Sequence, residues 1–174
     1  MPDTTITGTG YIKREEFKLF ADVSDTATPE WELQGDKVED LSIEMNANVE
    51  KGTDVTGSAY ADLDKYEEQT SVEPYRARKE SKLFAILYDI VKFRKTLSDV
   101  QRKFLCVNIF KNASGTYDAW TQDCIIEVQS YGGDTKGLAI PYNIHWTGKR
   151  TYGTATISDS GAVTFTADVE QPTE

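Results

Sequence analysis

The amino-acid sequence predicts one mainly β domain, a β-sandwich or barrel with a single α-helix packed on it. Three observations lead to this fold class. Apolar and polar residues alternate along several short runs, which is the pattern of strands with one buried face. Clusters of Gly, Asn, Asp and Ser separate the runs in the C-terminal half and predict turns. Only the segment at about 82–96 has its apolar residues at helical spacing.

The chain begins with a segment that is rich in Thr and Gly and has no apolar periodicity. A flexible N-terminal arm is therefore expected over 1–10, followed by a single domain over 11–174. A first strand is expected within 11–23, and a short strand with a turn at 31–35. The rest of the chain contains no internal repeat and no linker, so one domain is expected.

The clearest alternation in the sequence lies at 40–50. Apolar residues occupy every second position, namely Leu41, Ile43, Met45, Ala47 and Val49. A strand here would bury these side chains and turn a polar, acidic face toward solvent. That face would carry Asp40, Ser42, Glu44, Asn46, Asn48 and Glu50.

This strand is expected to be the first half of a long hairpin over about 40–70. A less regular return strand is predicted at 59–70. The loop between the two strands is too long for a two-residue turn. It comprises Lys51, Gly52, Thr53, Asp54, Val55, Thr56 and Gly57.

The predicted helix over about 82–96 has Ser81 as its N-cap. Its buried stripe consists of Leu83, Ile86, Leu87, Ile90 and Val91. The remainder of the chain predicts strands at 104–110, 124–129, 140–147, 151–157 and 162–169. Turns are expected between them at 112–115, 131–134, 148–150 and 158–161.

Charge is distributed unevenly along a chain whose net charge is −10. Residues 1–75 carry −12, residues 76–103 carry +6 and residues 104–174 carry −4. Specific binding of nucleic acid is not expected, because phosphate contacts need clustered Lys and Arg and this chain is strongly acidic. The basic block has two interpretations. It is either a solvated surface or a head-to-tail contact with an acidic neighbour, made by Arg76, Arg78, Lys79 and Lys82.

The sequence contains no recognisable catalytic, metal or cofactor signature, so no enzyme activity and no cofactor are expected. His145 is the only histidine and falls on the polar side of a predicted strand, which favours a surface or interface role. Cys106 and Cys124 lie in apolar runs and are expected to be buried thiols, with a disulfide left open. Their spacing matches no zinc pattern.

Other features favour structural roles. Neighbouring acidic residues such as Glu15 and Glu16 are expected by chance in a chain with 29 acids, although paired carboxylates could serve a hydrolase. Trp31, Trp120, Trp146 and Tyr142 could line a sugar-binding surface, but strand aromatics are more often core residues. No apolar run is long enough for a membrane span and the N-terminus lacks a signal-peptide pattern, so neither membrane insertion nor secretion is expected.

Four short motifs occur in a characteristic order. They are Trp-Glu-Leu-Gln-Gly at 31–35, Val-x-x-Leu-Ser-Ile-x-x-Asn at 38–46, Asp-Val-Thr-Gly at 54–57, and Val-Glu-Pro-Tyr at 72–75 just before the helix. In this order the chain, over about 10–157, resembles the major tail proteins, or tail tube proteins, of long-tailed bacteriophages of Gram-positive hosts.

The resemblance implies a β-sandwich-like subunit that forms hexameric rings stacked into the tail tube of a virion. It implies that the loop at 51–57 joins successive rings and that assembly takes place in the host cytoplasm. The implied partners are further copies of the chain, the tape-measure protein and the proteins at the tail ends, with no membrane. Double-stranded DNA would pass through the lumen without specific binding. The acidic face with Asp40, Glu44 and Glu50 would suit that lumen, because carboxylates repel phosphates.

Two other classes of function stay open from the residues. One is a carbohydrate-binding β-sandwich module of a cell-surface or baseplate protein. The other is a small hydrolase that uses paired carboxylates. Assembly into rings or tubes distinguishes the tail tube subunit from both.

Overall fold

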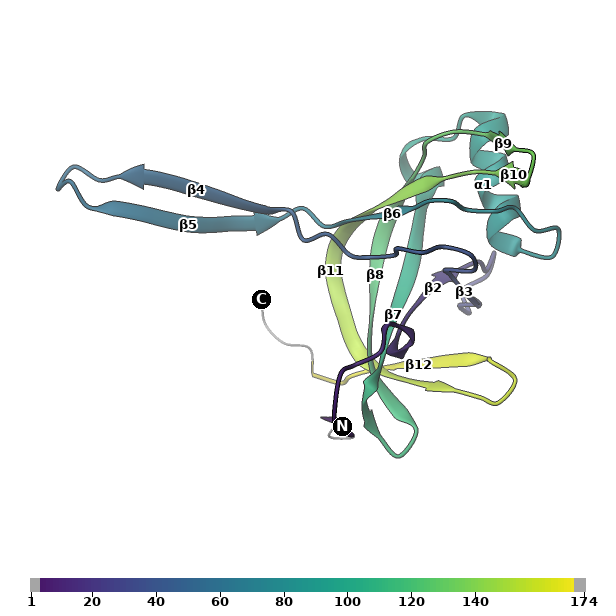
Figure 1. The fold of residues 1–174 in the computed structure, drawn as a ribbon, viewed down its shortest axis with the longest axis horizontal. Coiled ribbons are helices and arrows are strands. Elements are labelled where there is room, and N and C mark those ends of the chain that lie inside the picture. Colours follow the sequence, from purple (N-terminus) through teal and green to yellow (C-terminus); the bar gives the residue numbers. More distant parts are fainter. Residues whose placement is uncertain (1–3, 171–174) are drawn as a thin grey trace.

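The structure, a computed structural model, describes residues 4–170 of the chain. Its centre is an antiparallel sheet with the strand order β12-β11-β8-β7-β2-β3, in which β1 also pairs with β7 and β6 with β11 (Figure 1). Strands make up 51% and helices 11% of the structure, which confirms the predicted mainly β fold class. The strands of this sheet are β1 (Thr5–Ile6), β2 (Phe17–Asp22), β3 (Trp31–Leu33), β6 (Gln69–Val72), β7 (Gln101–Ala113), β8 (Thr116–Val128), β11 (Tyr142–Ile157) and β12 (Val163–Ala167).

The sheet is curled and buries apolar side chains on both of its faces. A large cluster fills the space between the sheet and α1, and a smaller cluster lies on the opposite face. Leu19 belongs to the first cluster and Phe20 to the second, because successive side chains of a strand point to opposite faces. Trp31 of β3 and Phe165 of β12 come from opposite edges of the sheet yet pack on the same small cluster. The sheet therefore closes part of the way toward a barrel.

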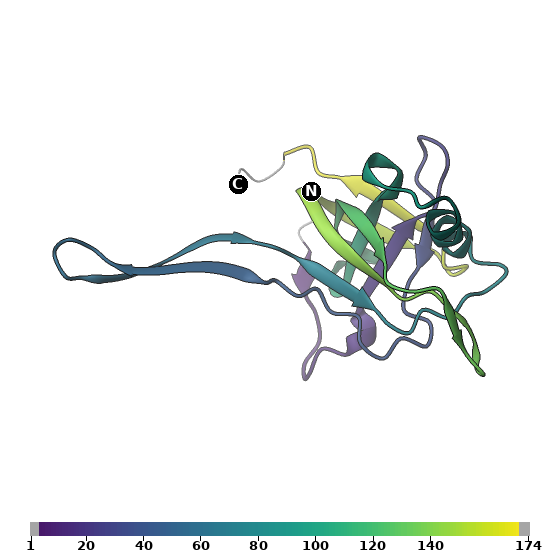
Figure 2. The ribbon, with the colours of Figure 1, turned by 90° about the horizontal axis from the view of Figure 1, so that it is seen from above.

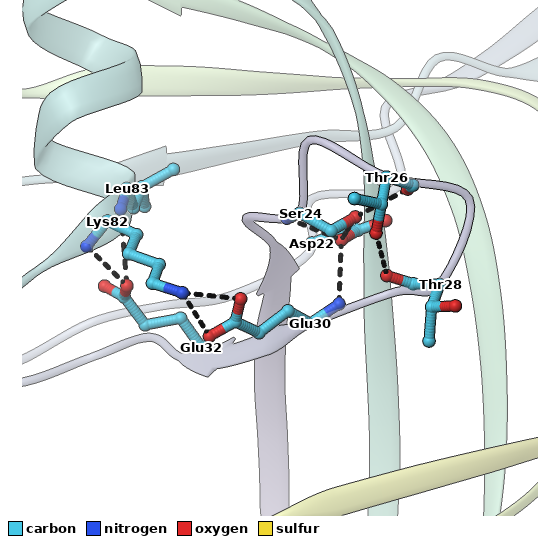
Figure 3. A network of polar contacts seen from close by, with 8 residues as sticks. All are labelled: Asp22, Ser24, Thr26, Thr28, Glu30, Glu32, Lys82 and Leu83. Carbon is cyan, nitrogen blue, oxygen red and sulfur yellow. Dashed lines mark hydrogen bonds and ion pairs between the residues drawn. The ribbon is translucent and has the colours of Figure 1, made fainter.

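The helix α1 (Lys82–Phe93) begins where the sequence predicts and ends three residues earlier. The Ser81 hydroxyl oxygen caps it by accepting a hydrogen bond from the backbone N–H of Phe84 at 3.2 Å. Glu32 of β3 places a carboxylate at the same helix end and accepts from the N–H of Lys82 at 2.9 Å (Figure 3). The helix stops because Arg94 adopts the left-handed conformation, with φ at 51°.

Polar contacts tie the N-terminus of α1 to the loop between β2 and β3, as Figure 3 shows. The ammonium group of Lys82 lies 2.6 Å from the carboxylate of Glu30. At the end of β2, Asp22 accepts hydrogen bonds from the backbone N–H groups of Glu30 at 3.1 Å and Ser24 at 3.0 Å. Loop, strand and helix thereby hold each other in place on the sheet.

Two hairpins and two 3₁₀ helices complete the described fold. The strands β4 (Ala47–Thr53) and β5 (Ala59–Tyr66) form a separate hairpin, and β9 (Gly132–Asp134) and β10 (Gly137–Ala139) form another. Two 3₁₀ helices, η1 (Arg14–Glu16) and η2 (Leu97–Val100), precede β2 and β7. Among residues 4–170, no helix is both long and apolar enough to cross a membrane.

The strand predicted at 40–50 is wrong in its first half, because β4 begins only at Ala47. Asn46 adopts a left-handed conformation with φ at 42°, which interrupts the alternation. Only Leu41 of the expected apolar face is buried, whereas Val49 is 44% exposed. The alternating sequence therefore spans two structures. Residues 40–46 form an extended segment that packs on the core through Leu41, and β4 extends away from the core.

Two further differences concern the chain ends and β11. Thr5 and Ile6, within the expected flexible arm, pair with Asn112 and Lys111 of β7, and residues 1–3 lie outside the described part. The turn predicted at 148–150 is a bulge inside one continuous strand, where Gly148 has φ at 67°. A bulge needs the same permissive residue as a turn, so composition could not distinguish the two.

Candidate assembly surface

The hairpin of β4 and β5, residues 47–66, extends well away from the rest of the molecule and is called the arm (Figures 1 and 2). Its strands form a two-stranded sheet of their own, with no pairing to the main sheet among the described residues. Every residue of β5, and all of β4 except Gly52, is exposed. An isolated two-stranded ribbon is at best marginally stable in water, so this arm is a candidate for a surface that a partner covers.

The pairing register gives the arm an apolar face. Val49 lies opposite Leu63, and Ala47 lies opposite Tyr66. These pairs share one face, because strand residues two apart point the same way and directly opposed residues point together. The larger side chains remain open to solvent: Val49 is 44%, Leu63 50% and Tyr66 52% exposed. The apolar face of the arm comprises Ala47, Val49, Ala59, Ala61, Leu63 and Tyr66, and toward the tip it also carries Lys51 and Thr53, opposite Ala61 and Ala59.

The other face of the arm is polar and carries opposed like charges. Glu50 pairs directly with Asp62, a placement that is unfavourable in a free hairpin. A register shift between Asn48 and Val49 leaves Asp64 as the extra residue of a bulge, and the Asn48 amide donates to its carboxylate at 3.4 Å. A partner that supplies cations to this face would relieve the repulsion between Glu50 and Asp62.

A hydrogen-bonded turn shapes the tip of the arm. The Asp54 carboxylate accepts from the hydroxyl of Thr56 at 2.6 Å and from the backbone N–H groups of Thr56 at 2.8 Å and Ser58 at 3.0 Å. These bonds, the one from the Thr56 hydroxyl above all, lower the pKa of Asp54 below its ordinary value. Gly57 closes the turn with φ at 84°. The side chain of Val55 is fully exposed at the tip.

A largely buried ion pair anchors the base of the arm to the main sheet. Glu68, two residues beyond β5, pairs with Arg150 of β11, and their side chains are only 12% and 24% exposed. The Arg150 Nε donates to the amide oxygen of Gln122 at 3.1 Å, and the Gln122 amide donates to Glu68 at 3.3 Å. The guanidinium also lies 4.9 Å from the ring centre of Trp120. The bulge at 148–150 thus brings Arg150 to the base of the arm.

The loop predicted to join rings divides into two parts in the structure. Lys51, Gly52 and Thr53 are the last residues of β4. The turn proper is formed by residues 54–58, in which Asp54 and Gly57 make the closing bonds. Because β4 extends to Thr53, the arm reaches farther from the core than a loop of the same length would.

The six predicted lumen residues do not form the face of one strand. All are exposed, but Asp40, Ser42 and Asn46 lie outside any strand, and Glu44 makes only an isolated bridge with Gln69. Asn48 and Glu50 belong to the arm rather than to the main sheet. The six residues therefore do not form one acidic strand face, because the left-handed Asn46 ends the alternation and β4 begins only at Ala47.

The predicted basic patch is largely neutralised within the chain. Arg76 pairs with Asp134 at 2.8 Å, Arg78 pairs with Asp36, and Lys82 pairs with Glu30. Lys79 is exposed in the turn before α1. The acidic partners come from distant parts of the sequence, so counting charges along the chain could not reveal them. The block is therefore mostly paired within the chain and offers few free cations for a docking contact.

The structure assembles a polar surface that the sequence reasoning did not identify. The pairing of β6, β11, β8 and β7 places polar side chains, together with Ile125, on one side of four neighbouring strands. This polar sheet face comprises Gln69, Ser71, Gln101, Lys103, Asp123, Glu127, Asn143, His145 and Thr147. In the sequence, only the position of His145 opposite the apolar residues of its strand indicated this face. The pairing register of the other strands could not be predicted from local pattern.

Charges on the polar sheet face are paired with one another. The His145 Nε2 lies 2.6 Å from a carboxylate oxygen of Glu127, and Lys103 lies 3.6 Å from Asp123. Hydrogen bonding, from His145 above all, lowers the pKa of Glu127 below its ordinary value. The face therefore presents one lysine beside two carboxylates and no basic cluster.

Two of the four aromatic candidates and both cysteines prove to be core residues. Tyr142 and Trp146 are buried, with hydrogen bonds from the Tyr142 hydroxyl to Gln34 at 3.1 Å and from the Trp146 indole to Thr70 at 2.9 Å. Neither can line a sugar-binding surface. Cys106 and Cys124 are free and buried, and burial raises the pKa of both thiols. Within residues 4–170, no group of three or more His, Cys, Asp or Glu side chains is arranged to hold a metal ion.

No family model and no curated protein matches this chain. Function is therefore inferred from the arm, from the polar sheet face and from the order of the sequence motifs.

Proposed function

We propose that this chain is the structural subunit of a tail tube of a long-tailed bacteriophage, which assembles with copies of itself into stacked hexameric rings. The observation that carries the proposal is the arm, whose apolar face is exposed in the isolated subunit. The order of motifs at 31–35, 38–46, 54–57 and 72–75 supplies the family resemblance. In this proposal the subunit has no enzymatic role.

The energetic case for a partner on the arm is simple. Completing the burial of Val49, Leu63 and Tyr66 on the apolar face would stabilise a contact by about 3 kcal/mol, since each side chain is roughly half exposed and full burial contributes about 2 kcal/mol. The same contact is repeated for every copy in a polymer. A weak contact between two subunits therefore becomes a strong assembly when each subunit belongs to a ring and a stack.

The charge of the molecule supports a passage for DNA rather than a binding site for it. The chain has a net charge of −10, and Lys103, the lysine of the polar sheet face, lies 3.6 Å from Asp123. Such a wall offers no cluster of cations to hold phosphates. We propose the polar sheet face as the lumen lining, with the tape-measure protein as its occupant before DNA and the tail-end proteins as the partners at either end of the tube.

Electron microscopy of the purified full chain tests the proposal directly. Negative staining and sedimentation velocity are expected to detect rings or tubes at high protein concentration. A matched variant shortens the arm by replacing residues 50–62 with Asn-Gly, which joins the paired residues Val49 and Leu63 through a two-residue turn. This variant should keep its circular dichroism spectrum and thermal midpoint but lose the assemblies.

Two results would overturn the proposal. One is a full chain that stays monomeric at every concentration tested. The other is a shortened variant that forms the same tubes as the full chain, since the arm would then be dispensable.

A further inference from the structure

We infer that a groove at the C-terminal end of α1 receives the tip of the arm of a second copy, an inference that rests on the proposed self-assembly. The groove has a volume of about 550 Å³ and lies between the end of α1, η2 and the end of β8. Its apolar lining includes Ile90, Val91, Leu97, Val100, Ile125 and Tyr131.

Leu97 at the rim of the groove has an unfavourable environment in the isolated subunit. Its side chain is 83% exposed, and its backbone is left-handed with φ at 57°. A bulky residue rarely adopts this conformation, and the strain is tolerated where another requirement keeps the residue in place. An apolar partner on the groove would cover this exposed side chain.

The arm offers the complementary shape and charge. Its tip presents Val55, which is fully exposed, on a turn that the Asp54 carboxylate holds together. Arg94 and Lys95 line the groove, Asp54 lies in the turn itself, and on the strands behind it Glu50 and Asp62 outnumber Lys51. An apolar knob with acidic neighbours would thus enter an apolar groove with basic neighbours.

The other charges at the groove are already engaged. Lys95 lies 3.9 Å from Asp89 of α1, a separation at the limit of an ion pair. Glu127 also lines the groove, and its carboxylate is bound by His145. Arg94 is exposed and remains the main cation available to an incoming carboxylate.

The backbone beside the groove is suited to a strand-like partner. The pairing of β7 with β8 ends at Gln101 and Ile125, so β8 continues for three residues, 126–128, beyond its neighbour. Unpaired edges of this kind accept a further strand. A hairpin arm has a free edge on each of its two strands, whereas a helical partner would not satisfy the edge of β8.

The arm and the groove lie at opposite ends of the molecule. In Figures 1 and 2 the arm extends to one side and α1 lies on the other, along the longest axis. The tip therefore cannot reach the groove of its own subunit. A contact between two different surfaces is heterologous, and repetition along the long axis extends the assembly in the direction of a tube.

Cross-linking between two introduced cysteines tests this contact. The variant with Val55→Cys and Leu97→Cys should give a ladder of covalent oligomers with a short bis-maleimide reagent. The native cysteines are buried and do not compete. The control carries Val55→Cys with Ser160→Cys, which places the second thiol in the exposed turn between β11 and β12, and should give few cross-links.

A second variant separates the contact from folding. Leu97→Asp suits a left-handed backbone better than leucine does, so the subunit should fold with unchanged or higher stability. It should raise the critical concentration for assembly about tenfold or more, since the burial of one leucine is lost and a carboxylate is placed in the groove.

The outcomes distinguish the two proposals. If the full chain forms tubes but the Val55 and Leu97 cysteines cross-link no better than the control pair, or if Leu97→Asp assembles normally, the groove is wrong and self-assembly stands. If the full chain forms no assemblies under the microscope, the proposed function fails and the groove fails with it.

Discussion

Replacing Glu68 with alanine is expected to destabilise the folded subunit, because it leaves Arg150 largely buried without its carboxylate. The pair joins the base of the arm to β11, with the two side chains 12% and 24% exposed. Arg150 would keep its hydrogen bond to Gln122 and its place over the Trp120 ring. The variant therefore removes the charge pairing while most of the local packing remains.

The magnitude follows from the degree of burial. Removing one partner of a fully buried pair costs about 3–5 kcal/mol, whereas an exposed pair contributes about 0–1 kcal/mol. The pair of Glu68 and Arg150 lies between these limits, so Glu68→Ala should lower the free energy of unfolding by about 2 kcal/mol. For a chain of 174 residues this corresponds to a thermal midpoint lowered by roughly 4–8 °C.

Urea unfolding of four proteins measures the interaction. The full chain, Glu68→Ala, Arg150→Ala and the double variant form a double-mutant cycle, followed by tryptophan fluorescence because Trp120 lies beside the pair. A coupling energy of about 1–2 kcal/mol is expected. Glu68→Gln serves as the control, since it keeps an acceptor and should lose less stability than Glu68→Ala.

Additive effects in the cycle, together with single losses below about 0.5 kcal/mol, would refute the reasoning. The pair would then behave as a surface ion pair, and the bulge in β11 would need another explanation than the anchoring of the arm.

Three further predictions concern the body of the molecule. Ser81→Ala should lower the free energy of unfolding by about 1 kcal/mol, since the cap of α1 is lost, whereas Ser81→Thr should retain most of it; urea unfolding measures both. Gly153→Ala should cost about 1–3 kcal/mol and displace β12, because the added Cβ would lie 2.2 Å from the carbonyl oxygen of Thr166, and unchanged stability would contradict this packing. Burial raises the pKa of the Cys106 and Cys124 thiols, so neither should react with a thiol reagent at pH 8 until the protein unfolds, and rapid labelling of the folded protein would show that the sheet opens there.

Much of the fold follows from local sequence pattern. The helix is recognisable because its apolar residues recur at helical spacing after a serine cap, and both features act within a few residues. The strands at 101–113 and 116–128 are recognisable from apolar runs and from the turn residues at 112–115 that separate them. Their lengths were underestimated, because the strands extend through polar residues such as Lys103 and Gln122.

The errors arise where one local pattern suits two structures. Alternation at 40–46 is equally compatible with a strand and with an extended segment, and the left-handed Asn46 ends it. Gly148 is equally suited to a turn and to a bulge. In each case the choice depends on what lies beside the segment, which a local pattern does not contain.

The candidate site depends on pairing between distant segments. Local alternation indicates that Val49 and Leu63 belong to strands, but their register places them together on the exposed face of the arm. The neutralisation of Arg76 by Asp134 and the pairing of Glu68 with Arg150 likewise join residues far apart in the chain. Strand and helix identity is a short-range property of an amino-acid sequence, whereas burial and exposure are settled by long-range contacts. For that reason the acidic strand face expected from alternation was replaced by an amphipathic arm and a polar sheet face.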